Sequence, residues 1–265
     1  MLYLVHQTVD SASWNETYSK GHVVRLGDFD IYSVGSPSKG LAMIVIYDIY
    51  GFNTSQTRVF CDRLASEYSV QVAMPDFFRG TAAPKNGNRT AWLAGVNNWS
   101  KVSNDLISVA NWLHNTSSTK QIGLVGFCWG GLQVVRACSN LSHLFSTGIS
   151  IHGSRITDTE VQQLKKPMLF IAAENDPALK PNISDAIEQA NPNISKQCQY
   201  KTYPNVTHGF VAAGANYSNP INLVAIDDVH TTIRNYLNKV IKNNSMILSM
   251  NFTFLLILLC FSFYL

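Results

Sequence analysis

The sequence predicts a doubly wound α/β fold, in which a mostly parallel β-sheet carries helices on both faces. Two observations lead to this class. Short apolar blocks rich in valine and isoleucine recur along the chain, and segments with helical periodicity separate them without an internal repeat or a low-complexity linker. Blocks that are apolar on both faces are typical of strands buried under helices in a parallel sheet. Their alternation with helices favours one α/β domain.

The elements follow in chain order. Strands are expected at 41–48, 70–76, 122–127, 147–153, 167–173 and 197–203. The clearest helix covers 101–114, where Val102, Leu106 and Val109 recur at helical spacing and form an apolar stripe. Further helices are expected at 56–68, 130–139, 182–190 and 221–242, and a loop at 79–96. We therefore divide the chain into an N-terminal extension (1–20), one domain (21–242) and a hydrophobic C-terminal segment (246–265).

Composition excludes several function classes. The 265 residues are 46% hydrophobic and 14% charged, enough for one sizeable core. The net charge of +3 is spread without basic runs, which argues against a nucleic-acid partner. No histidine pair or CxxC pair has metal-ligand spacing, and no glycine-rich phosphate loop follows a strand, so neither a metal nor a cofactor is predicted. The cysteines leave room for one or two disulfide bridges: Cys61, Cys128, Cys138, Cys198 and Cys260.

The C-terminal segment 246–265 holds no charged residue and is long enough to span a bilayer core. It suits a membrane tail anchor or the removable tail of a GPI signal, although the polar spacer expected of a GPI signal is absent. The N-terminal residues lack the pattern of a secretory signal, which taken alone indicates the cytosol.

N-glycosylation sequons favour a different location. The chain contains 12 of them, whereas chance placement of its asparagines, serines and threonines predicts roughly 3 to 4. We therefore expect a membrane-attached protein whose body is lumenal or extracellular and whose true start lies upstream of Met1, with a cytosolic protein as the alternative. The sequon asparagines are Asn15, Asn53, Asn88, Asn98, Asn115, Asn140, Asn182, Asn193, Asn205, Asn216, Asn243 and Asn251.

The stretch VGFCWGG, residues 125–131, lies where the strand at 122–127 gives way to a helix. A side chain held at such a tight turn needs small neighbours two residues before and two residues after, and Gly126 and Gly130 provide them. This is the spacing of the GxSxG nucleophile elbow, with Cys128 in the place of serine. The helix N-terminus lowers the pKa of a thiol there, so Cys128 is a candidate nucleophile.

The partners of such a nucleophile follow later in the chain, first an acid and then a histidine. Asp176 comes just after the strand at 167–173, and His208 lies in the loop after the strand at 197–203. The rival acid is Glu174, which lies closer to the strand, and the rival base is His152. Because His152 precedes the acid in the chain, we expect it at most to line the pocket.

With these motifs in place, the chain resembles the dienelactone hydrolase family of α/β-hydrolases, in which cysteine replaces serine as the nucleophile. The similarity covers about residues 20–240 and is carried by YDIYGFN (47–53), MPDFFRG (74–80), GFCWGG (126–131), ENDP (174–177) and HGF (208–210). The resemblance implies a triad of Cys128, His208 and Asp176. It also implies an oxyanion hole made by the backbone amides of Ile49 and Trp129.

Two departures from the family pattern concern substrate binding. Asp48 stands where family members typically carry a glutamate close to the thiol. The arginine that the family's lactone hydrolases carry after the active-site histidine is absent, since Val211 and Ala212 follow the HGF motif. Arg79 is expected to keep the other half of that anion site, because guanidinium groups suit carboxylates.

The sequence thus predicts a hydrolase that cleaves a small-molecule ester or lactone through a thioester intermediate. A glutamine amidotransferase, which also has a GxCxG elbow, is disfavoured because Gly209 and Phe210 follow His208 in place of the expected His-x-Glu pair. The alternative from another class is a membrane-tethered, glycosylated binding protein that keeps the hydrolase scaffold without catalysis. The substrate and the oligomeric state are not predicted.

Overall fold

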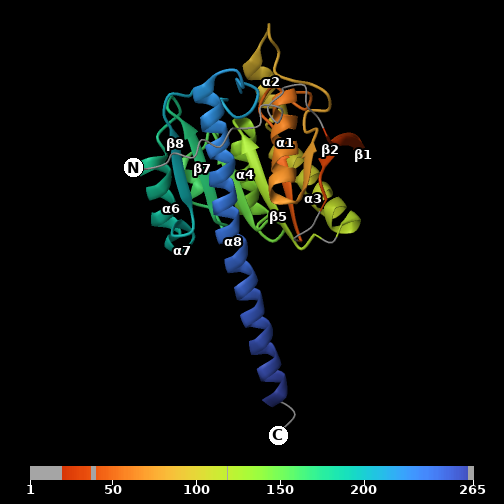
Figure 1. Ribbon diagram of the computed structural model, residues 1–265, viewed down its shortest axis with the longest axis vertical. Coiled ribbons are helices and arrows are strands. Elements are labelled where there is room, and N and C mark those ends of the chain that lie inside the picture. The colour runs from red at the N-terminus through yellow and green to blue at the C-terminus, as the bar shows by residue number, and fades with distance from the viewer. Residues whose placement is uncertain (1–19, 37–39, 118, 262–265) are drawn as a thin grey trace, which may run out of the picture.

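The apolar blocks of the sequence form one eight-stranded sheet in the computed structural model, which describes residues 20–36, 40–117 and 119–261, with side chains up to residue 241 (Figure 1). The strands lie in the order β1-β2-β4-β3-β5-β6-β7-β8. Strands β3 to β8 run parallel to one another, and β2 pairs antiparallel with both β1 and β4. Their bounds are β1 His22–Leu26, β2 Phe29–Val34, β3 Leu41–Ile46, β4 Gln71–Pro75, β5 Gln121–Phe127, β6 Thr147–Ile151, β7 Met168–Ala173 and β8 Gln199–Tyr203.

Six of these strands match the predicted blocks, and the hairpin of β1 and β2 is new. A two-residue turn at Gly27 and Asp28 joins the hairpin, and Gly27 has a left-handed φ of 59°. Strand β1 lies at the sheet edge and keeps most of its residues at least partly exposed. It therefore lacks the continuous apolar run by which the other strands were predicted.

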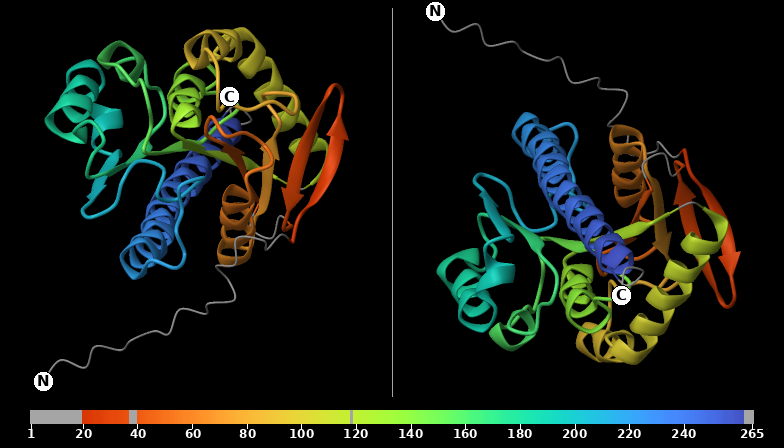
Figure 2. Two further views of the ribbon diagram at one scale, coloured as in Figure 1. Left: turned by 90° about the horizontal axis from the view of Figure 1, so that it is seen from above. Right: turned by 90° about the horizontal axis from the view of Figure 1, so that it is seen from below.

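Helices cover both faces of the sheet, as predicted for a doubly wound fold (Figure 2). Helices α1 and α8 lie on one face, while α3, α4 and α6 lie on the other. The helices are α1 Ser55–Tyr68, α2 Arg89–Val96, α3 Trp99–Thr116, α4 Trp129–Asn140, α5 Asp158–Val161, the π-helical turn η2 Leu179–Ile183, α6 Ser184–Ala190, α7 Pro192–Ser195 and α8 Pro220–Phe261.

The prediction of a loop over 79–96 is wrong in its second half, because residues 89–96 form α2. The Asn88 side chain accepts a hydrogen bond from the Ala91 amide at 2.9 Å and so caps the first turn of α2. None of the residues of α2 is fully buried. Instead, Trp92, Leu93 and Val96 pack against the core while they stay partly exposed.

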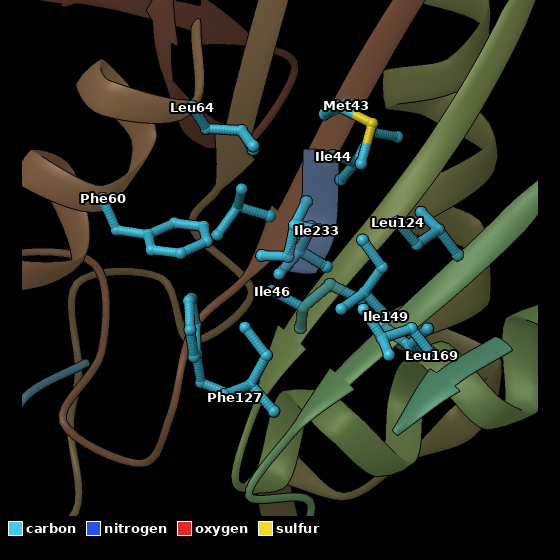
Figure 3. Close-up of a cluster of buried hydrophobic side chains, with 14 of the residues drawn as sticks. Met43, Ile44, Ile46, Phe60, Leu64, Leu124, Phe127, Ile149, Leu169 and Ile233 are labelled. Atoms are coloured by element: carbon cyan, nitrogen blue, oxygen red, sulfur yellow. The ribbon is translucent and has the colours of Figure 1, made fainter. Parts of the chain in front are cut away.

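One part of the apolar core packs between the sheet and the pair α1 and α8 (Figure 3). Phe60 of α1 meets Phe127 of β5 edge to face, with ring centroids 4.8 Å apart, and Ile233 of α8 packs beside Ile46. Phe127 immediately precedes Cys128, so this cluster fixes the end of β5. Truncation of a buried aromatic side chain of this kind costs about 3–5 kcal/mol.

The parallel strands all end at the same edge of the sheet. Asp48 follows β3, Cys128 follows β5, His152 follows β6, Asp176 follows β7 and His208 follows β8. Ligands of open α/β sheets bind at this carboxyl edge. The topology therefore gathers residues from five separate parts of the chain into one region.

Within the part of the chain whose side chains are described, no helix combines the length and the apolar character needed to cross a bilayer. The membrane-directed segment expected at 246–265 lies outside that part.

Candidate active site

Cys128 occupies a strained turn between β5 and α4, with φ 50° and ψ −109°. Gly126 and Gly130 make this turn sterically feasible. A Cβ atom on Gly126 would lie 2.2 Å from the carbonyl oxygen of Gly130, and one on Gly130 would lie 2.2 Å from that of Ile46. Because these neighbours are backbone atoms, no side chain can move aside, and the glycine spacing seen in the sequence has a direct steric cause.

The surrounding backbone holds Cys128 in this conformation. Its amide donates to the carbonyl of Ile151 at 3.2 Å, and its own carbonyl accepts from the amides of Gly131 at 3.1 Å and Ser154 at 2.9 Å. A left-handed backbone costs a non-glycine residue of order 1–3 kcal/mol. The three hydrogen bonds offset this cost and keep the partly exposed thiol at the N-terminus of α4.

The structure brings His208 between Asp176 and Cys128. The Nδ1 atom of His208 lies 2.6 Å from Oδ1 of Asp176, and His208 and Cys128 line the same cavity. The bond to Asp176 and then the bond to Cys128 raise the pKa of His208 to about 10, against the opposing effect of partial burial. Both interactions therefore favour the protonated form of the imidazole.

Further hydrogen bonds orient both partners of this pair. The second oxygen of Asp176 accepts from the Ala173 amide at 2.8 Å, and the His208 amide donates to the Asn175 side chain at 2.8 Å. Burial raises the pKa of Asp176, but the bonds from His208 and Ala173 outweigh it and hold the pKa below its usual value. Asp176 is thus an anion that stabilises the protonated form of His208. The turn ENDP supplies both Asn175 and Asp176.

Among the described residues, the hydrogen-bond partner of the His208 Nδ1 atom is Asp176 and not Glu174, the rival acid. Glu174 is exposed, and its carboxylate accepts from the Asn205 amide at 2.9 Å. It therefore holds the loop that carries His208 without contacting the imidazole.

Asp48 is buried beside the thiol. Its two oxygens accept hydrogen bonds from the amides of Tyr50 at 2.9 Å and Ala213 at 3.3 Å. Burial raises the pKa of this carboxyl group against the effect of those bonds. Asp48 thus ties the loop after β3 to the loop after His208, and both loops border the thiol.

The backbone amides expected to form an oxyanion hole flank Cys128. Ile49 follows Asp48 in the loop after β3, and Trp129 is the first residue of α4. Among the turn and loop hydrogen bonds of the described residues, none uses either amide as donor. Both N–H groups are therefore available to an oxygen that develops charge beside the thiol.

Two cavities border the thiol. The larger one, about 540 Å³, is lined by Asp48, Tyr50, Cys128 and His208 among others. The smaller one, about 30 Å³, is lined by Leu93, Trp129 and Leu132 beside Cys128. The site can therefore hold a substrate on both sides of the sulfur.

His152 is not among the residues that line these two cavities. It is 1% exposed, and its ring packs edge-on to that of His208, with centroids 4.8 Å apart. Burial lowers the pKa of His152 to about 3, and neither ring nitrogen has a hydrogen-bond partner among the described residues. His152 is therefore a buried, neutral side chain that packs against the ring of His208.

Arg79 likewise lies away from the cavities beside the thiol. Its guanidinium makes two hydrogen bonds each to Asp105, at 2.8 and 2.9 Å, and to Asp28, both at 3.0 Å. It also lies over the ring of Phe29, 4.6 Å from the centroid. A substrate carboxylate would have to displace an aspartate, so the expected anion site at Arg79 has no support and its role is structural.

Sequence reasoning missed Asn97, which follows α2. Its side-chain oxygen accepts from Nε1 of Trp129 at 3.3 Å and from Nε2 of Gln133 at 3.0 Å, and so holds the end of α2 against α4. Two N-capping asparagines, Asn88 and Asn98, mark the starts of α2 and α3. Those caps were the signal that could have revealed the helix.

Neither metal ligands nor a disulfide bridge are found in the described part of the chain. No group of three or more histidine, cysteine, aspartate or glutamate side chains there could hold a metal ion. The four described cysteines are free thiols, and Cys260 lies outside the described side chains.

The sheet order and the position of the turn at Cys128 define the α/β-hydrolase class. Solved structures share this fold. The chain matches the structure named "Putative Dienelactone Hydrolase" from Klebsiella pneumoniae with a TM-score of 0.62 and 18% identity over 79% of this chain and 92% of that one. A serine hydrolase without a lid from Xanthomonas campestris matches with a TM-score of 0.55 and 17% identity over 84% of this chain and 95% of that one.

The family model described as "Dienelactone hydrolase family" matches residues 29–240. A carboxymethylenebutenolidase homolog of Mus musculus is 31% identical over 225 residues, 83% of this chain and 91% of that protein. The Homo sapiens homolog is 30% identical over the same shares. The chain therefore belongs to the dienelactone hydrolase family, and it is a hydrolase of the ester- and lactone-cleaving class. The binding-protein alternative receives no support.

Proposed function

We propose that the protein hydrolyses a small-molecule carboxylic ester or lactone with Cys128 as nucleophile, His208 as its proton-transfer partner and Asp176 as the acid that orients His208. The observation that carries this proposal is one imidazole that lies 2.6 Å from a carboxylate oxygen and borders the same cavity as the elbow thiol. A nucleophile, a base and an orienting acid in this sequence of contacts are the requirements of acyl transfer.

Acylation begins with transfer of the proton of the Cys128 thiol to the imidazole of His208. The thiolate attacks the carbonyl carbon, a carbon–sulfur bond forms, and the carbonyl oxygen takes the negative charge. The amides of Ile49 and Trp129 donate hydrogen bonds to that oxygen, and the N-terminus of α4 favours the negative charge. When the carbon–oxygen bond breaks, the departing oxygen takes its proton from His208.

Deacylation uses the same groups in reverse order. His208, now neutral, accepts a proton from a water molecule, whose oxygen attacks the thioester carbon. The carbon–sulfur bond breaks, the acid product leaves, and the thiolate again pairs with the imidazolium. Asp176 keeps its charge throughout and holds His208 in the orientation that serves both steps.

The test is a panel of p-nitrophenyl esters and small lactones with wild type, Cys128→Ala and His208→Ala. Activity in the wild type that falls at least about a hundredfold in both variants supports the proposal. The two variants are expected to remain folded, since both positions are partly exposed. Circular dichroism and thermal unfolding check this point. Equal activity of all three proteins would discard the mechanism.

The location expected from the sequence is a second proposal. All nine sequon asparagines in the described part of the chain are exposed, as glycan attachment requires: Asn53, Asn88, Asn98, Asn115, Asn140, Asn182, Asn193, Asn205 and Asn216. A lumenal or extracellular body predicts a mobility shift of the natively expressed protein after N-glycosidase treatment. An unchanged mobility would favour the cytosolic alternative.

A further inference from the structure

The two cavities beside Cys128 differ in size and chemistry. The larger, about 540 Å³, is lined partly by polar groups, among them Asp48, Thr54 and His208. The smaller, about 30 Å³, lies against Leu93, Trp129 and Leu132. Ile49 and Cys128 line both cavities, so the oxyanion amide of Ile49 and the sulfur mark the boundary between them.

Proton transfer assigns each half of an ester to one cavity. The leaving oxygen must reach the imidazole of His208, which lines the larger cavity and is not among the residues that line the smaller one. The alcohol part of the substrate therefore lies in the larger cavity. Since the acyl carbon bonds to the sulfur with its oxygen in the oxyanion hole, the acyl chain points to the other side, into the smaller cavity.

The walls of the smaller cavity are held in place. Asn97 fixes the end of α2 to Trp129 and Gln133, and its side-chain oxygen is thereby already occupied. Phe78 packs against both Trp92 of α2 and Trp129, with centroids 5.0 and 4.7 Å away. Helix α2, which carries Leu93, therefore cannot withdraw without breaking these contacts.

From this arrangement we infer that the protein is specific for esters of short, uncharged acyl groups with larger polar or aromatic alcohols. This inference rests on the proposed function and specifies its substrate class. The smaller cavity, about 30 Å³, is far smaller than the larger one, about 540 Å³, so it admits only a short acyl group. The buried walls are apolar, and Arg155, the charged residue of the lining, is exposed.

The experiment compares kcat/KM for p-nitrophenyl acetate, butyrate and hexanoate in the wild-type protein. A misfit of one methylene in a hydrophobic pocket changes kcat/KM by about 10- to 200-fold, so acetate is expected to exceed hexanoate by at least about a hundredfold. Leu93→Ala enlarges the pocket and is expected to raise the hexanoate-to-acetate ratio at least about tenfold. Leu223→Ala, a half-buried leucine of α8 outside both cavities, is the control and leaves the ratio unchanged.

Thr54→Trp tests the opposite side of the sulfur. The indole fills part of the larger cavity, so the variant is expected to lose at least about tenfold in kcat/KM for 4-methylumbelliferyl acetate relative to ethyl acetate. Its acetate-to-hexanoate ratio stays that of the wild type. The opposite pattern, in which Thr54→Trp changes acyl selectivity and Leu93→Ala changes alcohol selectivity, would reverse the assignment and overturn the inference.

Failure of the inference differs from failure of the proposed function. Loss of all esterase activity in Cys128→Ala, together with wild-type hexanoate turnover within about threefold of acetate, overturns the acyl assignment alone. A p-nitrophenyl hemisuccinate turned over faster than the acetate would also overturn it, since Arg155 would then bind an acidic acyl chain. Activity that persists in Cys128→Ala instead contradicts the proposed function.

Discussion

Replacing Asp176 with asparagine tests the electrostatic partner of His208 with little change of shape. The pKa of His208 lies at about 10 in place of 6.5, and the bond to Asp176 is the largest cause. Each pKa unit corresponds to about 1.4 kcal/mol. Because the His208 side chain is 38% exposed and Cys128 shares in the shift, screening by solvent leaves about 1–2 kcal/mol for the carboxylate. We therefore expect kcat/KM to fall at least about 10- to 30-fold.

The assay for Asp176→Asn has two readouts. Steady-state hydrolysis of p-nitrophenyl acetate gives kcat/KM, and the rate of iodoacetamide alkylation of Cys128 against pH reports the thiolate that pairs with the imidazolium. In Asp176→Asn, both kcat/KM and the alkylation rate are expected to fall at neutral pH. Glu174→Gln, which removes the neighbouring carboxylate that does not touch His208, is the matched control. The reasoning is refuted if Asp176→Asn keeps wild-type kcat/KM, or if Glu174→Gln shows the loss instead.

Three further perturbations test other parts of the site. The raised pKa of His208 means that its pairing with Asp176 stabilises the fold fully below pH of about 6.5 and that this contribution is lost as pH rises through about 10. The urea midpoint of wild type minus that of Asp176→Asn is therefore expected to shrink from pH 7 to pH 10.5, and a constant difference would contradict this pairing. Gly126→Ala places a Cβ atom 2.2 Å from a backbone oxygen, so it is expected to lower the free energy of unfolding by about 1–3 kcal/mol and to remove most of the esterase activity. Gly95→Ala in α2 is the control, because its Cβ atom meets nothing within 4 Å. Equal denaturation midpoints and equal rates for the two variants would count against the steric account. Arg79→Met is expected to lower the free energy of unfolding by about 1–3 kcal/mol, and with it the melting temperature, while kcat/KM for neutral esters stays unchanged. An unchanged melting temperature with a raised KM would instead indicate that Arg79 binds the substrate.

The elbow could be predicted from sequence because its requirement is local. Gly126, Cys128 and Gly130 lie within five residues, and the close backbone contacts that require the glycines follow from one tight turn. The positions of Asp176 and His208 could also be predicted, since parallel strands end at a common sheet edge and each residue directly follows a strand.

The roles of Arg79 and His152 could not be read in the same way. Arg79 is held by Asp28 and Asp105, which lie 51 and 26 residues away in the chain, and no local pattern reveals that the three converge. His152 ends a strand as a catalytic residue would, yet its ring is buried behind His208. Position at the sheet edge was predictable from sequence, but side-chain direction and ion pairing depend on the packed tertiary structure.

Helix α2 illustrates the same limit for secondary structure. It has no buried residue, so hydrophobic periodicity gives no signal, and its stability depends on the cap at Asn88 and on the contacts of Trp92 and Asn97. Because α2 forms one wall of the small cavity, acyl selectivity was also beyond sequence reasoning.

The most direct test of the central claim is the detection of an acyl group on Cys128. Wild-type protein mixed with p-nitrophenyl acetate, quenched in acid and digested, is predicted to show one added acetyl group on the peptide that contains Cys128. The adduct should disappear after treatment with neutral hydroxylamine, as a thioester does, and it should be absent from Cys128→Ala. Continued turnover with no adduct at Cys128, or with the acetyl group on another residue, would contradict the proposed mechanism.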